Sequence, residues 1–216
     1  MEIFWFGHSC FRITERNLAT VVTDPYDHRA VGYSALKLKA DIVTVSHKAP
    51  GHDFLSGVKG DAYHITGPGE FEVGGVFITG IQTNGHAKKV DDEPRNTLYL
   101  IEYNGVNVLH LGAIDRVPTQ TEVEDLGPVH VALVPIGGGT GLNASKAAEV
   151  ISLLEPNIVI PMHYATPEST ITLDTLGRFL KEMGLSDIQV QPSFKVTTVN
   201  SLPEETQVIV LGYQGN

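Results

Sequence analysis

The chain has 216 residues, of which 42% are hydrophobic, and its formal net charge at pH 7 is −10. This composition supports a buried core, and the acidic balance argues against non-specific binding to nucleic acid or to an anionic membrane. Cys10 is the only cysteine, so an intrachain disulfide and a cysteine-rich zinc site are both excluded. The length fits one domain spanning residues 1–216.

The first half of the chain is predicted to form short strands joined by tight turns. Gly74-Gly75 and Asn104-Gly105 lie between apolar runs, and both dipeptides are typical of hairpin turns. The run at 41–46 is almost entirely β-branched or apolar, as in strands buried on both faces. Strands are expected at 2–6, 10–14, 19–23, 41–46, 63–66, 71–73, 76–80, 96–103 and 106–111.

The second half is predicted to alternate strands with amphipathic helices. Strands are expected at 129–135, 157–161 and 207–211. Between them, Asn143 is expected to cap a helix that ends before Pro156, and a second helix is expected from about 170 to 183. This alternation indicates an α/β layer arrangement.

Histidine is enriched, with nine residues in the chain. Four histidines follow predicted apolar strands or lie in the loop just after one: His47, His52, His86 and His163. Because strand ends of this kind meet at one edge of a sheet, we expect the four imidazoles to cluster, with or without a metal ion. The remaining histidines other than His8 are interpreted as structural.

Several further motifs accompany these histidines: GHSCF at 7–11, Thr23-Asp24-Pro25, 45–52, 80–86, Leu111-Gly112, 137–141 and 160–164. Together they resemble the motifs of metallo-β-lactamase-fold hydrolases, in the branch similar to ascorbate-6-phosphate lactonase. The resemblance implies an α/β fold, a four-layer αββα sandwich, with a two-metal site at one edge of the paired sheets. It also implies that Asp24 orients the metal-binding loop by hydrogen bonds; the alternative is a turn residue before Pro25.

The chain departs from this family at several ligand positions. The family's loop His-x-His-x-Asp-His falls on His47, Ala49, Gly51 and His52, and its bridging aspartate falls on Ala113. His86 and His163 match the other two histidine positions. Two adjacent divalent cations repel each other unless bridging anions offset the repulsion. We therefore expect at most one zinc or other divalent metal per chain, or none.

Other residues leave two interpretations open. His8 is either a pocket residue or a plain turn residue. Asp53 and Asp115 lie near the missing carboxylate positions, and either could compensate for them. Gly138, in the loop 137–141, is part of a pocket wall or of a flexible connection. Tyr164 either donates a hydrogen bond to a substrate or is an ordinary half-buried tyrosine.

Two functions follow from these observations. The first is a metal-dependent hydrolase acting on a small ester, lactone or phosphate ester. The second is a metal-free, non-catalytic homologue that binds a ligand or partner through the former cleft. If loss of ligands is the only defect, the triple change Ala49→His, Gly51→Asp and Ala113→Asp is expected to raise zinc occupancy towards two.

The expected location is the cytoplasm, because no signal peptide and no membrane helix can be identified in the sequence. The expected partner is a small-molecule substrate or ligand, with no binding to nucleic acid or membrane. An oligomer is compatible with the sequence.

Overall fold

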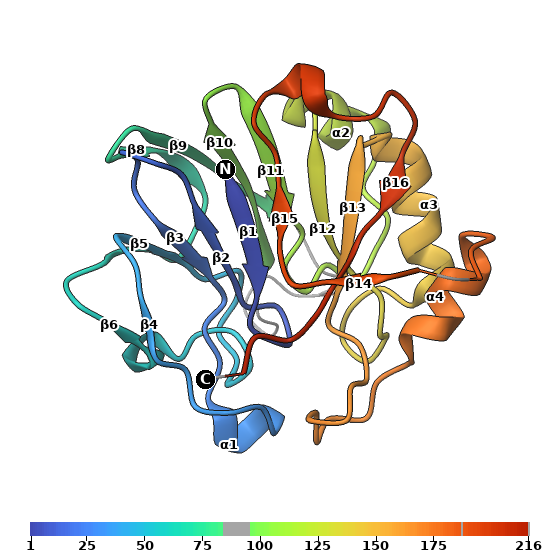
Figure 1. The fold of residues 1–216 in the computed structure, drawn as a ribbon, viewed down its shortest axis with the longest axis horizontal. Coiled ribbons are helices and arrows are strands. Elements are labelled where there is room, and N and C mark those ends of the chain that lie inside the picture. Colours follow the sequence, from blue (N-terminus) through green and yellow to red (C-terminus); the bar gives the residue numbers. More distant parts are fainter. Residues whose placement is uncertain (84–95, 187, 216) are drawn as a thin grey trace.

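The computed structural model describes residues 1–83, 96–186 and 188–215. Two β-sheets pack face to face (Figure 1). The N-terminal sheet has the order β15-β1-β2-β3-β5-β7, and the larger sheet has the order β16-β13-β12-β11-β10-β9-β8. The strands of the N-terminal sheet are β1 Glu2–Trp5, β2 Phe11–Thr14, β3 Val21–Thr23, β5 Ile42–Thr44, β7 Tyr63–Ile65 and β15 Phe194–Lys195.

The larger sheet joins an antiparallel meander to a parallel half. Strands β8 to β11 pair antiparallel, whereas β11, β12, β13 and β16 pair parallel. Its strands are β8 Gly69–Val73, β9 Val76–Thr83, β10 Asn96–Tyr103, β11 Val106–His110, β12 Val131–Pro135, β13 Ile158–Met162 and β16 Gln207–Val208. Two small pairs complete the strands: β4 Leu38–Lys39 with β6 Val58–Lys59, and β14 Val190–Gln191 with β17 Val210–Leu211.

The two outer layers differ in how much helix they contain. Helices α2 Gln120–Leu126, α3 Ala144–Leu154 and α4 Leu176–Glu182 lie on the side of the larger sheet (Figure 1). On the other side, an apolar cluster joins the N-terminal sheet to the segments around β4, β6 and the short helix α1 His28–Val31. Short 3₁₀ turns occupy Leu55–Gly57 and Val199–Ser201. The predicted αββα sandwich is therefore confirmed, with an outer layer on the N-terminal side that is mostly loop.

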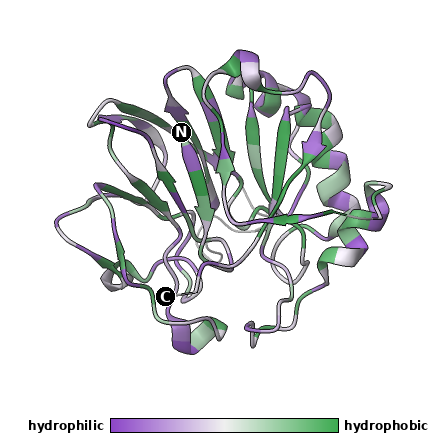
Figure 2. Ribbon diagram, in the orientation of Figure 1, coloured by the Kyte–Doolittle hydropathy of each residue, from purple (hydrophilic) through white to green (hydrophobic). Residues whose placement is uncertain are grey.

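The main core lies between the two sheets. Alternate residues of β1 and β2, such as Ile3 and Ile13, point into it. Every residue of β12 and β13 is buried, because helices cover their outer face while the N-terminal sheet covers the inner one. Figure 2 shows the resulting apolar run along both strands. Among the described residues, no helix is long and apolar enough to cross a membrane.

Local signals in the sequence account for most element boundaries. The two predicted hairpin turns connect β8 to β9 and β10 to β11, and Asn104 and Gly105 adopt φ of 50° and 82°, as a tight hairpin turn requires. Asn143 caps α3 by accepting a hydrogen bond from the backbone N–H of Lys146. These predictions are confirmed.

Two predictions in the C-terminal half need correction, and one helix there was not predicted. Helix α4 begins at Leu176, whereas residues 170–175 run as a loop whose Asp174 donates its backbone N–H to the Gly137 carbonyl. The run 207–211 splits into β16 and β17, which pair with different strands, β13 and β14. Helix α2 was not predicted; Thr119 and Glu122 form a capping box at its start.

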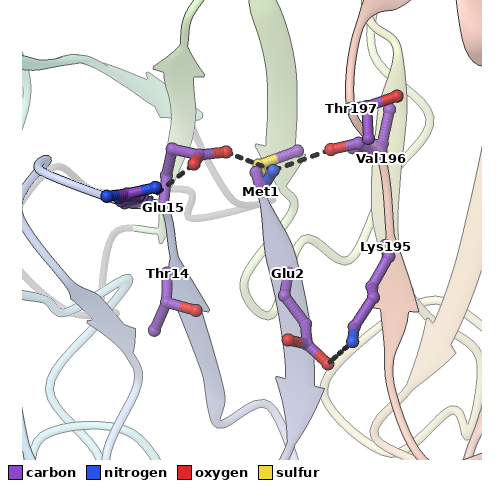
Figure 3. A pocket seen from close by; sticks show the side chains of 8 residues that line it. Met1, Glu2, Thr14, Glu15, Lys195, Val196 and Thr197 are labelled. Atoms are coloured by element: carbon purple, nitrogen blue, oxygen red, sulfur yellow. Dashed lines mark hydrogen bonds and ion pairs between the residues drawn. The ribbon is translucent and has the colours of Figure 1, made fainter.

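Charged groups hold the N-terminal end of β1 in place (Figure 3). The amino group of Met1 donates to the Val196 carbonyl at 2.7 Å and forms an ion pair with Glu15. The Lys195 ammonium lies 3.5 Å from the Glu2 carboxylate. These charges line a cavity of 520 Å³ but interact with one another, so they hold β1 between β2 and β15.

Candidate metal centre

Four histidines from three segments of the chain line one cavity of 390 Å³. His8 lies in the turn between β1 and β2, and His47 follows β5. His52 lies in the loop after His47, and His163 follows β13. These turns occupy the same edge of the two sheets, which is why residues so distant in sequence meet here.

Three of these imidazoles form a group that could hold a metal ion. His8, His52 and His163 each offer one nitrogen, and these nitrogens all lie within 4.8 Å of one another. The ring centroid of His8 is 4.8 Å from that of His52 and 4.3 Å from that of His163. Nitrogens bound to one tetrahedral zinc lie about 3.3 Å apart, so this group is somewhat wider than a set of nitrogens around one ion.

The backbone holds His8 and His163 in an unfavourable conformation. Their φ angles are 51° and 53°, in the left-handed region that non-glycine residues seldom adopt. The backbone N–H of His163 donates to the His8 carbonyl at 3.0 Å, and the indole N–H of Trp5 donates to the same oxygen at 3.0 Å. Such strain persists only where surrounding contacts fix it, and it is concentrated at functional sites.

Asp24 organises the loop that carries His47 and His52. Its carboxylate is fully buried and accepts hydrogen bonds from the backbone N–H of Ser46 at 2.7 Å and from the Ser46 hydroxyl at 2.6 Å. It also lies 2.8 Å from Nδ1 of His52. Burial by itself raises the pKa of the Asp24 carboxyl. The nearby imidazoles of His110 and His52 and the Ser46 hydroxyl outweigh burial and lower this pKa to about 2.

This carboxylate also determines which ring nitrogens carry protons. Ionised Asp24 only accepts, so Nδ1 of His52 must carry the proton, and Nε2 keeps its lone pair for a metal. The Ser46 hydroxyl donates its one proton to Asp24. Nδ1 of His47, 3.2 Å from that hydroxyl oxygen, is therefore the donor to it, which leaves Nε2 of His47 free to accept a proton.

His8, His47 and His163 are neutral at pH 7. Burial lowers the pKa of His163 to about 3, with a further contribution from repulsion by His52 and His47. Burial and repulsion by His52 lower the pKa of His47 to about 4. Burial, followed by repulsion from the other three imidazoles, places the pKa of His8 well below its ordinary value. Neutral imidazole is the form that binds a metal, so these three imidazoles need lose no proton at neutral pH.

The donor set fits a single divalent cation. Nδ1 of His8 and Nδ1 of His163 are buried, and neither has a hydrogen-bond partner among the described residues. Buried polar atoms are normally paired, so two unpaired nitrogens in one cluster indicate a site built for something that binds nitrogen. Imidazole nitrogen suits zinc, and three such ligands leave a fourth tetrahedral position for a small molecule.

Only some of the other positions singled out from the sequence line the cavity of the histidines. Ala49 and Gly51 line the cavity with the histidines, and Gly139 and Thr140 form its wall where Gly138 was expected. Four candidates are not among the residues that line it: Asp53, Asp115, Gly138 and Tyr164. Tyr164 is buried and stacks on Trp5 at 5.2 Å. His86 lies outside the described residues.

The position expected for a bridging aspartate is held by hydrogen bonds to the side chain of Asn96. The N–H of Ala113 donates to the side-chain oxygen of Asn96 at 2.9 Å, and the amide nitrogen of Asn96 donates to the Leu111 carbonyl. Gly112 has a φ of 59°, and a Cβ there would meet that Asn96 oxygen at 2.3 Å. The turn is thus fixed by Asn96, and the group of three histidines includes no carboxylate.

Two supporting residues could not be identified from the sequence. Ser46 connects Asp24 to His47, and only its place directly before His47 hinted at this. His110 is fully buried, and its Nε2 lies 2.9 Å from the carbonyl oxygen of Ser9, next to His8. It connects β11 to the turn that carries His8, a contact between residues about a hundred positions apart.

The fold and this site define the class of protein. Residues 2–163 match the model of the β-lactamase superfamily domain, so the chain belongs to that superfamily. A UPF0173 protein of Pyrococcus furiosus is 31% identical over 188 residues, which cover 77% of this chain and 84% of that one. The chain is thus a member of the UPF0173 family.

Other relatives agree with this assignment. A UPF0173 metal-dependent hydrolase of Methanopyrus kandleri is 25% identical over 221 residues, covering 88% of this chain and 95% of its own length. The crystal structure of a candidate zinc-dependent hydrolase of the metallo-β-lactamase superfamily from Thermotoga maritima superposes with a TM-score of 0.78. That protein is 33% identical, and the alignment covers 97% of both chains.

Proposed function

We propose that this chain is a hydrolase that uses one divalent cation held by His8, His52 and His163. The observation that carries this proposal is the convergence of three buried imidazoles, two of which have a nitrogen without a hydrogen-bond partner among the described residues. Buried nitrogens of structural histidines are usually paired with protein hydrogen-bonding groups. The family's relatives, several of which are named metal-dependent hydrolases, agree with this chemistry.

One zinc ion is the occupant that we infer. Three nitrogen ligands favour zinc over magnesium or calcium, which prefer oxygen. Two cations would need a bridging anion, and the cluster contains no carboxylate that could supply it. A bound zinc supplies Lewis acidity at the fourth coordination position.

Two residues beside the three proposed ligands, Asp24 and His47, have further roles. Asp24 holds His52 in the tautomer that presents Nε2, so it is a positioning residue. His47 lines the same cavity and is half-buried, and its ring centroid lies 4.1 Å from that of His52. With its proton on Nδ1, His47 can accept a proton at Nε2 from a reacting group in the cavity.

The proposed substrate is a small ester, lactone or phosphate ester. A cavity of 390 Å³ accepts a small molecule, and much of its lining is apolar: Ala30, Val31, Ile171 and Leu173 lie beside the histidines. The resemblance to ascorbate-6-phosphate lactonase is the reason for including lactones. We further propose that the protein works in the cytoplasm on such molecules, without binding nucleic acid or membrane.

Turnover with and without zinc tests this function. The panel would hold an aryl acetate, a γ-lactone, an aryl phosphate monoester and an aryl phosphodiester. We expect at least one to be hydrolysed in a zinc-dependent way, and we expect His163→Ala to abolish the activity. His64→Ala, which changes an exposed histidine on β7, is the matched control. No activity with any compound would favour the metal-free, non-catalytic homologue that binds a ligand or partner through this cleft. Activity that does not depend on zinc would contradict the proposed mechanism.

A further inference from the structure

The segment between β13 and α4 leaves the end of β13 and reaches α1 (Figure 1). We call residues 165–175 the strap. Its two ends are tied together, because the N–H of Ala165 donates to the Asp174 carbonyl at 2.9 Å and a β-bridge joins Ala165 to Thr175. The N–H of Asp174 donates in turn to the Gly137 carbonyl at 2.8 Å. The strap is thus a loop with a fixed base, of the compact kind that is frequently functional.

The tip of the strap is fastened to α1 and to a residue just after it. The N–H of Thr170 donates to the Val31 carbonyl at 3.1 Å. The Thr166 hydroxyl donates to the hydroxyl oxygen of Tyr33 at 2.9 Å. These two hydrogen bonds connect the strap, which follows the larger sheet, to the outer layer on the N-terminal side.

Gly32 allows the tip of the strap to lie directly against α1. A Cβ placed on Gly32 would lie 2.5 Å from the Glu168 carbonyl oxygen and 2.7 Å from the Thr170 backbone nitrogen. Ordinary contacts to carbon begin near ~3.5 Å, so a larger residue at position 32 would force these backbone atoms away. The φ of Gly32 is 92°, which by itself also favours glycine. The matched control is therefore a glycine with a similar φ and no close neighbour.

The fastened strap places three side chains in the wall of the histidine cavity: Ile171, Thr172 and Leu173. Ile171 also packs against the apolar cluster on the outer side of the N-terminal sheet. Leu173 lies beside the loop 137–141, because its Cδ2 would be 3.5 Å from a Cβ placed on Gly139. Two of the three side chains are aliphatic, so the strap gives the cavity an apolar wall.

Hydrogen bonds hold the strap more than apolar packing does. None of residues 165–175 is buried, and at the tip Pro167, Glu168 and Thr170 are exposed. Segments with few buried apolar contacts open locally at a small cost in free energy. The tip can therefore separate from α1 while the hydrogen bond between Ala165 and Asp174 keeps the base closed.

We propose that the strap is a lid over the cavity, and that Ile171 and Leu173 in the closed strap limit the substrate to one with a short apolar group, such as the acyl chain of a small ester. This inference rests on the proposed function, because it narrows the substrate of that site. A short chain fits against Ile171 and Leu173 while the tip is fastened. A longer chain needs the space that these side chains fill, so it requires the tip to separate from α1.

Amide hydrogen exchange in zinc-free protein tests whether the tip is fastened at Gly32. Gly32→Ala should raise the exchange rate of the Thr170 amide by at least about tenfold, since the added Cβ displaces its hydrogen bond to Val31. Gly60→Ala is the matched control: its φ is 104°, and nothing lies within 4 Å of the added Cβ. Thr166→Val removes one hydrogen bond of the tip with little change of shape and should act in the same direction. Thermal unfolding would show whether each variant folds.

The length of an ester's acyl chain tests the size limit. The values of kcat/KM for p-nitrophenyl acetate, butyrate and octanoate would be compared in the presence of zinc. Wild type should prefer acetate, and the octanoate-to-acetate ratio should rise at least about tenfold in Leu173→Ala and in Gly32→Ala. Leu185→Ala, which shortens an exposed leucine outside the cavity, is the matched control and should keep the wild-type ratio.

The two experiments can fail independently. An unchanged Thr170 exchange rate in both Gly32→Ala and Thr166→Val would overturn the fastening of the strap, whether or not the protein hydrolyses esters. Faster exchange together with an unchanged chain-length ratio in Leu173→Ala would overturn the size limit and leave the proposed function intact. If wild type hydrolyses no ester, the proposed function fails, and the size limit fails with it.

Discussion

Asp24→Asn changes one buried atom, and its consequences can be worked out from the hydrogen bonds. The Asp24 carboxylate accepts from the Ser46 N–H, the Ser46 hydroxyl and Nδ1 of His52. An amide has one accepting oxygen and one NH₂ group. If the NH₂ faces the Ser46 N–H, a buried backbone donor loses its partner. If the NH₂ faces His52, the imidazole proton moves to Nε2 and blocks the nitrogen that the metal needs.

Two independent arguments give the size of the stability loss. A lost hydrogen bond to a charged group costs about 1.5–3 kcal/mol. The pKa of Asp24, lowered from 3.8 to about 2, corresponds to roughly 2 kcal/mol of stabilisation at pH 7. Both describe the same interactions, so they are not added. We expect Asp24→Asn to lower the free energy of unfolding by about 2–3 kcal/mol and zinc affinity by about 10–100-fold.

Urea unfolding followed by the fluorescence of Trp5, the only tryptophan, measures the first effect. Zinc titration measures the second. Asp53→Asn is the matched control, because Asp53 is adjacent to His52 in sequence but does not line the cavity. We expect the control to change unfolding by less than about 0.5 kcal/mol. If Asp24→Asn behaved like Asp53→Asn in both assays, the role assigned to the carboxylate would be refuted.

Three further predictions concern the metal, pH and the fold. After dialysis against zinc, elemental analysis should find at most one equivalent per chain; two retained equivalents would contradict the all-histidine site. The pKa values of His163 and His47, about 3 and about 4, lie below the ordinary 6.5, so the unfolded chain takes up protons first. Metal-free protein should keep its full stability above pH ~6.5. As the pH falls from there towards each pKa, the free energy of unfolding should decrease by about 1.4 kcal/mol per pH unit for each of the two histidines. A free energy of unfolding, measured in urea, that stays constant from pH 7 to pH 4.5 would contradict this prediction. Thr119→Ala should destabilise by about 1 kcal/mol through loss of the α2 capping box, and Thr121→Ala, inside the helix, should cost much less.

The sequence predicted those elements whose signals are local. The hairpin at Asn104-Gly105 and the cap at Asn143 each depend on a few adjacent residues. The start of α4 was misplaced because Leu173 continued the apolar spacing of the helix. In the structure Leu173 is apolar for another reason: it lines the histidine cavity. Periodicity could not separate these two causes. For α2 the capping box at Thr119 and Glu122 was readable, but the helix has no long apolar stripe to support it.

The candidate site was predictable only in part, for a physical reason. The placement of His47, His52 and His163 after strands was enough to expect their convergence. The role of His8 depends on contacts of the β1–β2 turn with His52 and His163, which are distant from it in the sequence. From the sequence alone His8 was therefore either a pocket residue or a plain turn residue.

Anomalous diffraction at the zinc edge from zinc-soaked crystals tests the central claim most directly. We predict one strong peak per chain, within bonding distance of nitrogens of His8, His52 and His163. A peak bound by His47 and His52 without His8, a second peak of equal height in the cavity, or no peak there would contradict the account.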